Sequence, residues 1–308
     1  MYVPFMMLAQ ACAIAAIAGE SPIQAELLGE FATFVHRNHS GNRIGYRFHE
    51  HTPLVYGDVP QSAEEARQVD SSAQAEADRF RHRPGVKTHR KRVDEEGWIP
   101  QVWTFYLAPV QDGIDMLLVV EAEDTGLPEF YGIQQCFRLS GATNAEWRQK
   151  YACTPAFSEY DLWAQTPGDA GKTSLTWLSR GGALQQLPAC KETVGCRTHY
   201  GEAIDARRSG GRLDTLTHVG PYNARMLETA DSGLVLRTSH DRSWSCGIYW
   251  QRSTHLTNHH PADCLHAIVN IGGVPPHSKR AVQGKIYWLR GSGEELVRHW
   301  RRDFPNSE

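Results

Sequence analysis

The sequence predicts a mainly β protein, built as a single antiparallel β-sandwich or jelly-roll-like domain with an inserted helix at about residues 62–80 and another helix at the C-terminus. From residue 98 onward the chain consists of short runs rich in β-branched and aromatic residues, separated by clusters of Gly, Pro, Asp and Ser. With 308 residues and a hydrophobic content of 41%, the chain is also long enough to bury one large core.

The expected strands are short. They cover residues 102–107, 114–120, 130–139, 173–178, 233–238, 246–251, 265–271 and 283–289. Many short strands with turn signals between them are typical of a sandwich rather than of an α/β fold. In the run 265–271, alternate residues share a face, so we expect His266 to point with Ile268 and Asn270, opposite Leu265, Ala267 and Val269.

Two segments carry helix signals. Ser62 and Glu65 form a capping box before a stretch rich in Ala, Gln, Glu and Arg, which predicts the inserted helix. Ser292 and Glu295 form another capping box near the end of the chain. The apolar residues after it recur at about the helical period: Leu296, Val297, Trp300 and Phe304.

Residues 1–19 predict a secretory signal peptide, because an apolar run ends in an Ala16-x-Ala18 cleavage pattern. The alternative is a buried N-terminal helix, since the basic residues that usually open a signal peptide are missing. Residues 20–308 then form one β-sandwich domain with a helical and basic insertion at residues 60–95. We therefore expect a secreted or periplasmic protein.

Seven cysteines suit an exported protein if most of them are paired or buried. Cys136 with Cys153 and Cys190 with Cys196 each bracket a short loop and are candidate disulfides. The alternative is that the cysteines fill core positions as free thiols.

The net charge of −3 argues against nucleic acid as a partner, because nucleic-acid binding normally requires a basic surface. We expect no membrane segment after removal of the signal peptide, and the oligomeric state is not indicated. A local basic run nevertheless occurs between Arg79 and Arg92. It either is a solvated loop or binds an anion such as an acidic polysaccharide, with Arg90 as a substrate-binding residue.

A histidine-rich segment precedes the run 265–271. Imidazole and carboxylate groups are common metal ligands, so His259, Asp263 and His266 are candidates to bind a divalent ion such as Zn, Mn or Ca, and His260 is a candidate catalytic residue. These histidines could instead hydrogen-bond to neighbouring backbone. A second group surrounds Glu50, where His49 and His51 would share one face of a strand. If that strand lies beside residues 265–271, the two groups could form a single site.

The remaining candidates suit β-elimination on a uronic-acid chain, which needs a base, an acid and a group that neutralises the carboxylate. Tyr200 could be the acid or base with His199 beside it, and Arg225 or Arg252 could neutralise the carboxylate. Trp250 and Tyr222 are the candidate aromatic contacts to the substrate.

Three further segments resemble in texture exported bacterial β-sandwich proteins of carbohydrate metabolism: residues 131–137, 258–264 and 284–288. The resemblance is to no single family and implies no catalytic residue. We therefore expect an exported carbohydrate-active enzyme that acts on an acidic polysaccharide or oligosaccharide by lyase chemistry. One alternative is a glycoside hydrolase with a Glu/Asp pair such as Glu159 and Asp161. The other is a non-catalytic glycan-binding or envelope protein.

Overall fold

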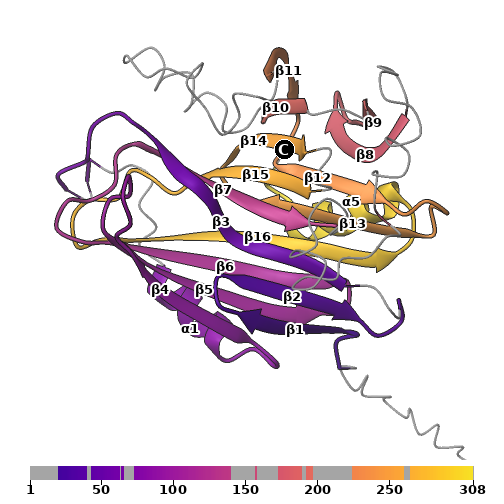
Figure 1. The fold of residues 1–308 in the computed structure, drawn as a ribbon, viewed down its shortest axis with the longest axis horizontal. Helices are drawn as coiled ribbons and strands as arrows, with labels where there is room; N and C mark the ends of the chain where they lie inside the picture. Colours follow the sequence, from indigo (N-terminus) through magenta and orange to yellow (C-terminus); the bar gives the residue numbers. More distant parts are fainter. Residues whose placement is uncertain are drawn as a thin grey trace, which may run out of the picture.

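The computed structural model confirms a mainly β fold in which two sheets pack face to face (Figure 1). It describes residues 20–39, 43–62, 64–65, 73–139, 157, 173–188, 192–196, 224–259 and 264–307. Within these residues, each sheet contains eight strands. The expectation of a β-sandwich with a C-terminal helix is thus correct.

The strands of the first sheet are, in spatial order, β1 (Ile23–Leu28), β2 (Phe31–His36), β3 (Arg43–Tyr56), β7 (Phe130–Arg138), β15 (Cys264–Asn270), β14 (Ser253–His259), β10 (Glu192–Cys196) and β11 (Ala224–Ala230). Those of the second sheet are β4 (Lys87–Val93), β5 (Gln101–Val110), β6 (Gly113–Ala122), β16 (Lys279–Arg290), β13 (Trp244–Trp250), β12 (Leu234–Thr238), β8 (Thr173–Arg180) and β9 (Ala183–Pro188). Neighbouring strands are antiparallel except for the parallel pair β10 and β11.

The core lies between the two sheets and is built by the period-two alternation of their strands. In β15, Leu265, Ala267 and Val269 belong to the core, whereas His266 lies on the opposite face, as the sequence predicts. The second sheet contributes Trp103 and Trp288, both fully buried. Side chains from both sheets form one continuous cluster, so the two layers share a single core.

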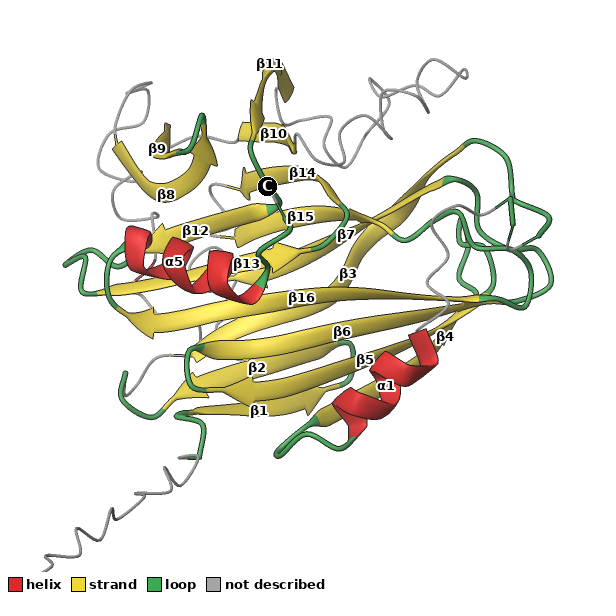
Figure 2. Ribbon diagram, turned by 180° about the vertical axis from the view of Figure 1, so that it is seen from behind, coloured by secondary structure: helices red, strands yellow, loops and turns green. Residues whose placement is uncertain are grey.

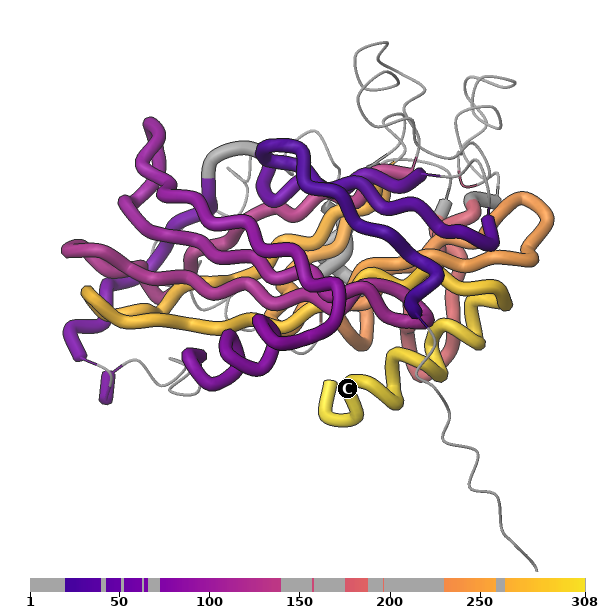
Figure 3. The backbone as a smooth tube through the Cα atoms, turned by 90° about the horizontal axis from the view of Figure 1, so that it is seen from below, coloured from indigo at the N-terminus to yellow at the C-terminus, as the bar shows by residue number. Residues whose placement is uncertain are grey.

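The two helices cover the outer face of the second sheet (Figures 2 and 3). Helix α1 (Ala73–Arg81) packs over Tyr106 and Leu117. Helix α5 (Gly293–Asp303) begins after its N-cap Ser292, as predicted, and buries Leu296 and Trp300. The predicted capping box at Ser62 and Glu65 forms reciprocal hydrogen bonds, but α1 begins only at Ala73.

The candidate disulfides are not formed, because Cys136 and Cys196 are buried free thiols. Cys136 lies instead on the outer face of the first sheet, where it approaches His266. Neither described helix has the length and apolar character needed to cross a bilayer.

Candidate functional site

The outer face of the first sheet carries a buried polar cluster, in contrast to the apolar residues under the helices on the second sheet. Three adjacent strands supply it: Glu50 from β3, Gln134, Cys136 and Arg138 from β7, and Cys264 and His266 from β15. The register places His266 directly opposite Cys136, and Cys264 directly opposite Arg138. Since residues two apart share a face of a strand, Cys264 and His266 point the same way.

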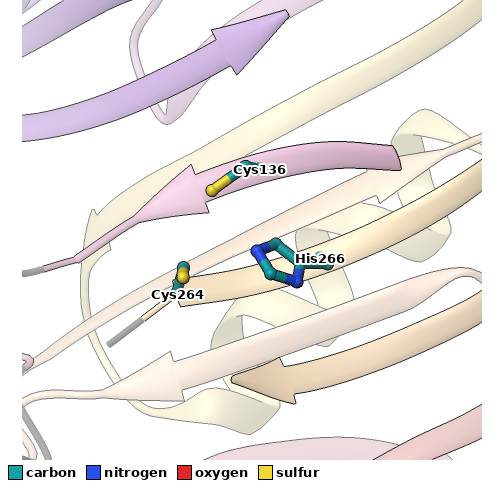
Figure 4. Close-up of side chains that lie close together, drawn as sticks. All are labelled: Cys136, Cys264 and His266. Atoms are coloured by element: carbon teal, nitrogen blue, oxygen red, sulfur yellow. The ribbon is translucent and has the colours of Figure 1, made fainter. Parts of the chain in front are cut away.

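Cys136, Cys264 and His266 form what we call the thiol–imidazole cluster. Their two sulfur atoms and one imidazole nitrogen all lie within 4.8 Å of one another. Figure 4 shows the two cysteines and the imidazole ring converging on one place between β7 and β15. The exposed fractions are 0% for both cysteines and 1% for His266, so this is a closed site.

Glu50 joins this cluster to a cation. Its Oε2 lies 3.3 Å from Nε2 of His266 and accepts a hydrogen bond from the Gln134 amide at 3.1 Å. Its Oε1 accepts a hydrogen bond from the Arg138 guanidinium at 2.5 Å. The carboxylate is only 6% exposed, and all of its partners come from the same sheet face.

The buried charges shift one another's ionisation. Burial raises the pKa of Glu50, but His266 and Arg138 outweigh it and hold that pKa well below its usual range. Burial lowers the pKa of His266, whereas Cys264 and Glu50 raise it, with a net result of about 9. Burial raises the pKa of the Cys136 thiol far above its ordinary value. In the absence of a bound cation, Glu50 and His266 are therefore an ion pair, and the thiol of Cys136 is neutral.

The metal ligands predicted from the sequence are only partly brought together. His266 is in the thiol–imidazole cluster, whereas Asp263 lies outside the described residues, as does the candidate catalytic residue His260. The register places His259 of β14 opposite Cys264, although its side chain is outside the described set. Strand β3 does not lie beside β15, because β7 runs between them. The two predicted groups nevertheless meet, through Glu50 rather than through His49.

A second group of potential ligands lies beside the middle of β3, where Glu30, His49 and Glu95 approach one another. The ammonium group of Lys91 lies among them: it donates hydrogen bonds to Glu30 and, at 2.8 Å, to Glu95. It also lies 3.5 Å from the imidazole of His49. Because a lysine already supplies the positive charge, this group is an ion-pair network rather than a cation site.

A small cavity, the end pocket, opens where strands of both sheets end. It has a volume of about 310 Å³ and is lined by Pro22, His36, Asn38, Gln111, Trp244, Leu289 and Arg290. Trp244 begins β13, and Arg290 is the exposed last residue of β16. The pocket therefore combines an indole ring with amide, imidazole and guanidinium groups, and none of its lining residues is acidic.

Two imidazoles hold Trp244 in place. The ring of His39 stacks on the indole with centroids 4.3 Å apart, and the ring of His36 meets it edge-on at 4.9 Å. Burial lowers the pKa of both histidines, that of His36 to about 4, so both are neutral near pH 7. Nδ1 of His36 accepts the backbone N–H of Asn38, and Nδ1 of His39 accepts the indole N–H of Trp288. Each neutral ring therefore carries its proton on Nε2.

A larger cavity, the side groove, adjoins the end pocket and shares Gln111 with it. Its volume is about 810 Å³. The lining residues are Glu20, Ser21, Ile23, Gln24, Ala25, Arg83, Pro84, Gly85, Lys87, Pro109, Val110 and Gln111. The basic run of the sequence thus reaches this groove through Arg83 and Lys87.

Most of the basic run is paired with carboxylates. Arg79, Arg81, Arg83, Arg90, Lys91 and Arg92 each lie within ion-pair distance of at least one Asp or Glu. The contact of Arg90 is long, 3.9 Å to Glu121. Among the described residues, no carboxylate lies within ion-pair distance of Lys87, which is exposed. Lys87 is consequently the cation of this run with most freedom to meet a ligand.

The other candidate residues from the sequence lie in different surroundings. His199, Tyr200 and Tyr222 lie outside the described residues, and Arg225 lies in β11 with an undescribed side chain. Trp250 is 1% exposed and packs in the core, which leaves it no open surface for a substrate. Arg252 donates a hydrogen bond to the backbone oxygen of Asn270 at 2.7 Å and has a left-handed backbone, with φ of 60°.

Sequence reasoning missed Glu50 and Cys136 as partners of His266, and it missed Trp244 and Arg290. The signal for Glu50 was present, because it lies between two histidines already singled out. Cys136 could be found only once the register between β7 and β15 was known. The end pocket is formed by strand ends and turns that are far apart in the chain, so no local sequence motif indicates it.

No family model matches the chain, and no curated protein matches its sequence. Among solved structures, the chain is similar to an Escherichia coli K12 protein described as a "Putative aldose 1-epimerase". The TM-score is 0.36 and the sequence identity 10%, and the match covers 87% of this chain and 99% of the other. A likeness at this level does not assign an activity to the chain.

Proposed function

We propose that the protein is an exported carbohydrate-active enzyme that holds an acidic oligosaccharide along the end pocket and the side groove. The observation that carries this proposal is the end pocket itself, where a tryptophan fixed by two imidazoles lies among amide and guanidinium groups. A pyranose ring has apolar C–H faces and a rim of hydroxyl groups. An indole ring beside planar polar side chains is complementary to both.

The preference for an acidic sugar is supported by the cations along the two cavities. Arg290 lies exposed at the end pocket and Lys87 at the side groove. A guanidinium group can bind a carboxylate through two parallel hydrogen bonds. The end pocket has room for about one sugar unit, and the side groove can take the units that follow.

The reaction that we propose is β-elimination at a uronic acid. Arg290 would neutralise the sugar carboxylate, which makes the neighbouring C–H more acidic. His199 and Tyr200 remain our candidates for the proton transfers. Hydrolysis by a Glu/Asp pair and binding without turnover are the alternatives that the assays must separate.

Binding is tested by calorimetry with a tetrasaccharide of uronic acids and with its neutral counterpart, in which the carboxyl groups have been reduced. The acidic sugar should bind at least tenfold more tightly. Arg290→Gln should weaken binding of the acidic sugar by about tenfold to a hundredfold, as loss of a charge-assisted hydrogen bond does. Arg92→Gln is the matched control, because it removes the same charge from an exposed strand position that lines neither cavity. Equal affinity for both sugars, or no binding at all, would overturn the proposal.

Turnover is measured on the same acidic sugar by the near-ultraviolet absorbance of an unsaturated uronate and by the release of reducing ends. A rise in both that is lost in Tyr200→Phe supports β-elimination. Reducing ends without the absorbance change would replace the lyase proposal with hydrolysis. Binding with neither signal would show a glycan-binding protein.

A further inference from the structure

The thiol–imidazole cluster offers a set of ligands that the end pocket and side groove do not use. Cys136, Cys264 and His266 lie on neighbouring antiparallel strands, so the sheet fixes their relative positions without help from a loop. Their ligand atoms are within 4.8 Å of one another. In a tetrahedral zinc site, bonds to sulfur and nitrogen put neighbouring ligand atoms about 3.5 Å apart. Small rotations of the three side chains would bring their ligand atoms to this separation.

Glu50 adds a carboxylate oxygen on the imidazole side of the cluster, outside the group of ligand atoms that lie within 4.8 Å of one another. Its Oε2 is 3.3 Å from Nε2 of His266, and its Oε1 is held by Arg138 at 2.5 Å. Outer contacts of this kind orient a ligating carboxylate and are typical of metal centres. Gln134, which lies opposite Glu50 on β7, also donates its side-chain amide N–H to Oε2.

Charge balance favours a divalent ion here. A metal ion keeps its cysteine ligands deprotonated, so two thiolates and the Glu50 carboxylate would contribute three negative charges. A divalent ion together with the Arg138 guanidinium contributes three positive charges. The buried part of the cluster is then neutral, as a closed site requires, and the remaining charge is that of Arg47, which lies 3.6 Å from Glu50 and is 30% exposed.

We propose that Cys136, Cys264 and His266, with Glu50 as fourth ligand, bind one Zn²⁺ ion. Thiolate and imidazole ligands select zinc over the harder ions Mn²⁺ and Ca²⁺, which prefer oxygen. The ligands come from three strands, so the ion would link β3, β7 and β15. Because these ligands are buried and occupy all four coordination positions, the ion would have no open position for a substrate.

The test uses the purified full chain in reducing buffer without any sugar, so its result does not depend on the proposed function. The protein should contain close to one equivalent of zinc. Co²⁺ added to metal-free protein should produce visible bands of a tetrahedral site and a thiolate charge-transfer band in the near ultraviolet. Zn²⁺ should abolish both. Absence of zinc together with absence of these bands would overturn the proposal.

Variants identify the ligands. Cys136→Ser, Cys264→Ser and His266→Gln should each weaken Co²⁺ binding at least tenfold and alter the bands, whereas Glu50→Gln should shift the visible bands and leave the charge-transfer band. Cys246→Ser and Cys196→Ser are matched controls, because both thiols are free and fully buried outside the cluster. Unchanged bands in Cys264→Ser, or bands lost in Cys246→Ser, would show that the ion binds elsewhere.

A measurement on the unaltered protein covers the case in which a ligand variant does not fold. In dilute urea, Zn²⁺ should slow alkylation of Cys136 and Cys264 at least tenfold, as followed by peptide mapping. Cys196 and Cys246 serve as internal references, and their rates should not change. Equal rates at all four cysteines with and without zinc would contradict the proposal.

Discussion

Lys285 is the most enclosed of the charged residues that anchor α5. The residue is 4% exposed, and its ammonium group lies 2.7 Å from Asp112 and 2.6 Å from Asp303 of α5. Asp115 adds a third carboxylate at 3.4 Å. Burial lowers the pKa of Lys285, but these carboxylates raise it further, so the residue stays charged.

We expect Lys285→Met to destabilise the protein by about 1–3 kcal/mol, because three partly buried carboxylates lose a shared cation, while Asp112 and Asp303 keep Arg302 and Asp115 keeps Arg83. The free energy of unfolding from urea titration measures this. Lys279→Met is the control: Lys279 is 41% exposed and lies 3.4 Å from Glu121, so its loss should cost less than about 1 kcal/mol. If both variants lost a similar amount of unfolding free energy, the burial of Lys285 would not explain its contribution to stability.

His36 predicts a pH dependence of stability. Its pKa is lowered from 6.5 to about 4, chiefly by burial and additionally by His39, so the unfolded chain takes up a proton before the folded protein does. The stability contributed by the neutral ring is complete above about pH 6.5 and is lost as the pH falls towards 4.

The measurement is the free energy of unfolding between pH 7 and pH 4. In His36→Asn, the free energy of unfolding should decrease less steeply as the pH falls. The slope should change by at most the amount that the uptake of one proton contributes. His277→Asn, which alters a histidine with a 73% exposed side chain, should leave the decline as steep as in the unaltered protein. An unchanged slope in His36→Asn would refute the assignment.

At the scale of elements, α5 depends on its first turn. The side chain of Ser292 accepts the backbone N–H of Glu295 at 3.3 Å. Ser292→Ala should lower stability by about 1 kcal/mol, because the first turn then has an unsatisfied donor. Ser292→Asp keeps an acceptor at the cap and should retain most of the stability. Urea midpoints of the three proteins decide this, and equal midpoints for Ser292→Ala and the parent would exclude a role for the cap.

Sequence periodicity located strands where apolar and β-branched residues dominate. All eight expected strands occur, and the face assignment of His266 is correct. It missed β4, whose seven residues include Lys87, Arg90, Lys91 and Arg92, because charge hid the alternation. It also missed β14, in which His255, Thr257 and Asn258 are buried although they are polar. In the sequence, a strand of polar residues resembles a loop, and only the structure shows that these residues are buried.

The site was predictable only in part for the same reason. His266 stood out as one of several histidines, whereas Cys136 and Glu50 meet it through strand pairings that join distant parts of the chain. Sequence pattern sets the face on which a residue lies, but only the register sets its neighbours.

For the whole molecule, the shared core predicts a single unfolding unit. Trp103, Trp250 and Trp288 of the second sheet pack in one cluster with Tyr131 and Phe137 of the first. Tryptophan fluorescence and far-ultraviolet circular dichroism should therefore report the same urea midpoint and the same slope. Two separate transitions would show that residues 20–308 contain more than one domain.

The position of the basic strand β4 has a consequence for the molecule among its neighbours. β4 forms one border of the second sheet, and Lys87, Thr88, Arg90 and Arg92 are exposed along it. A border strand offers unpaired backbone groups to which another chain could add, and positive side chains there repel a like strand. The charges that look like a ligand-binding run in the sequence thus also protect the folded protein from self-association and aggregation at its open edge.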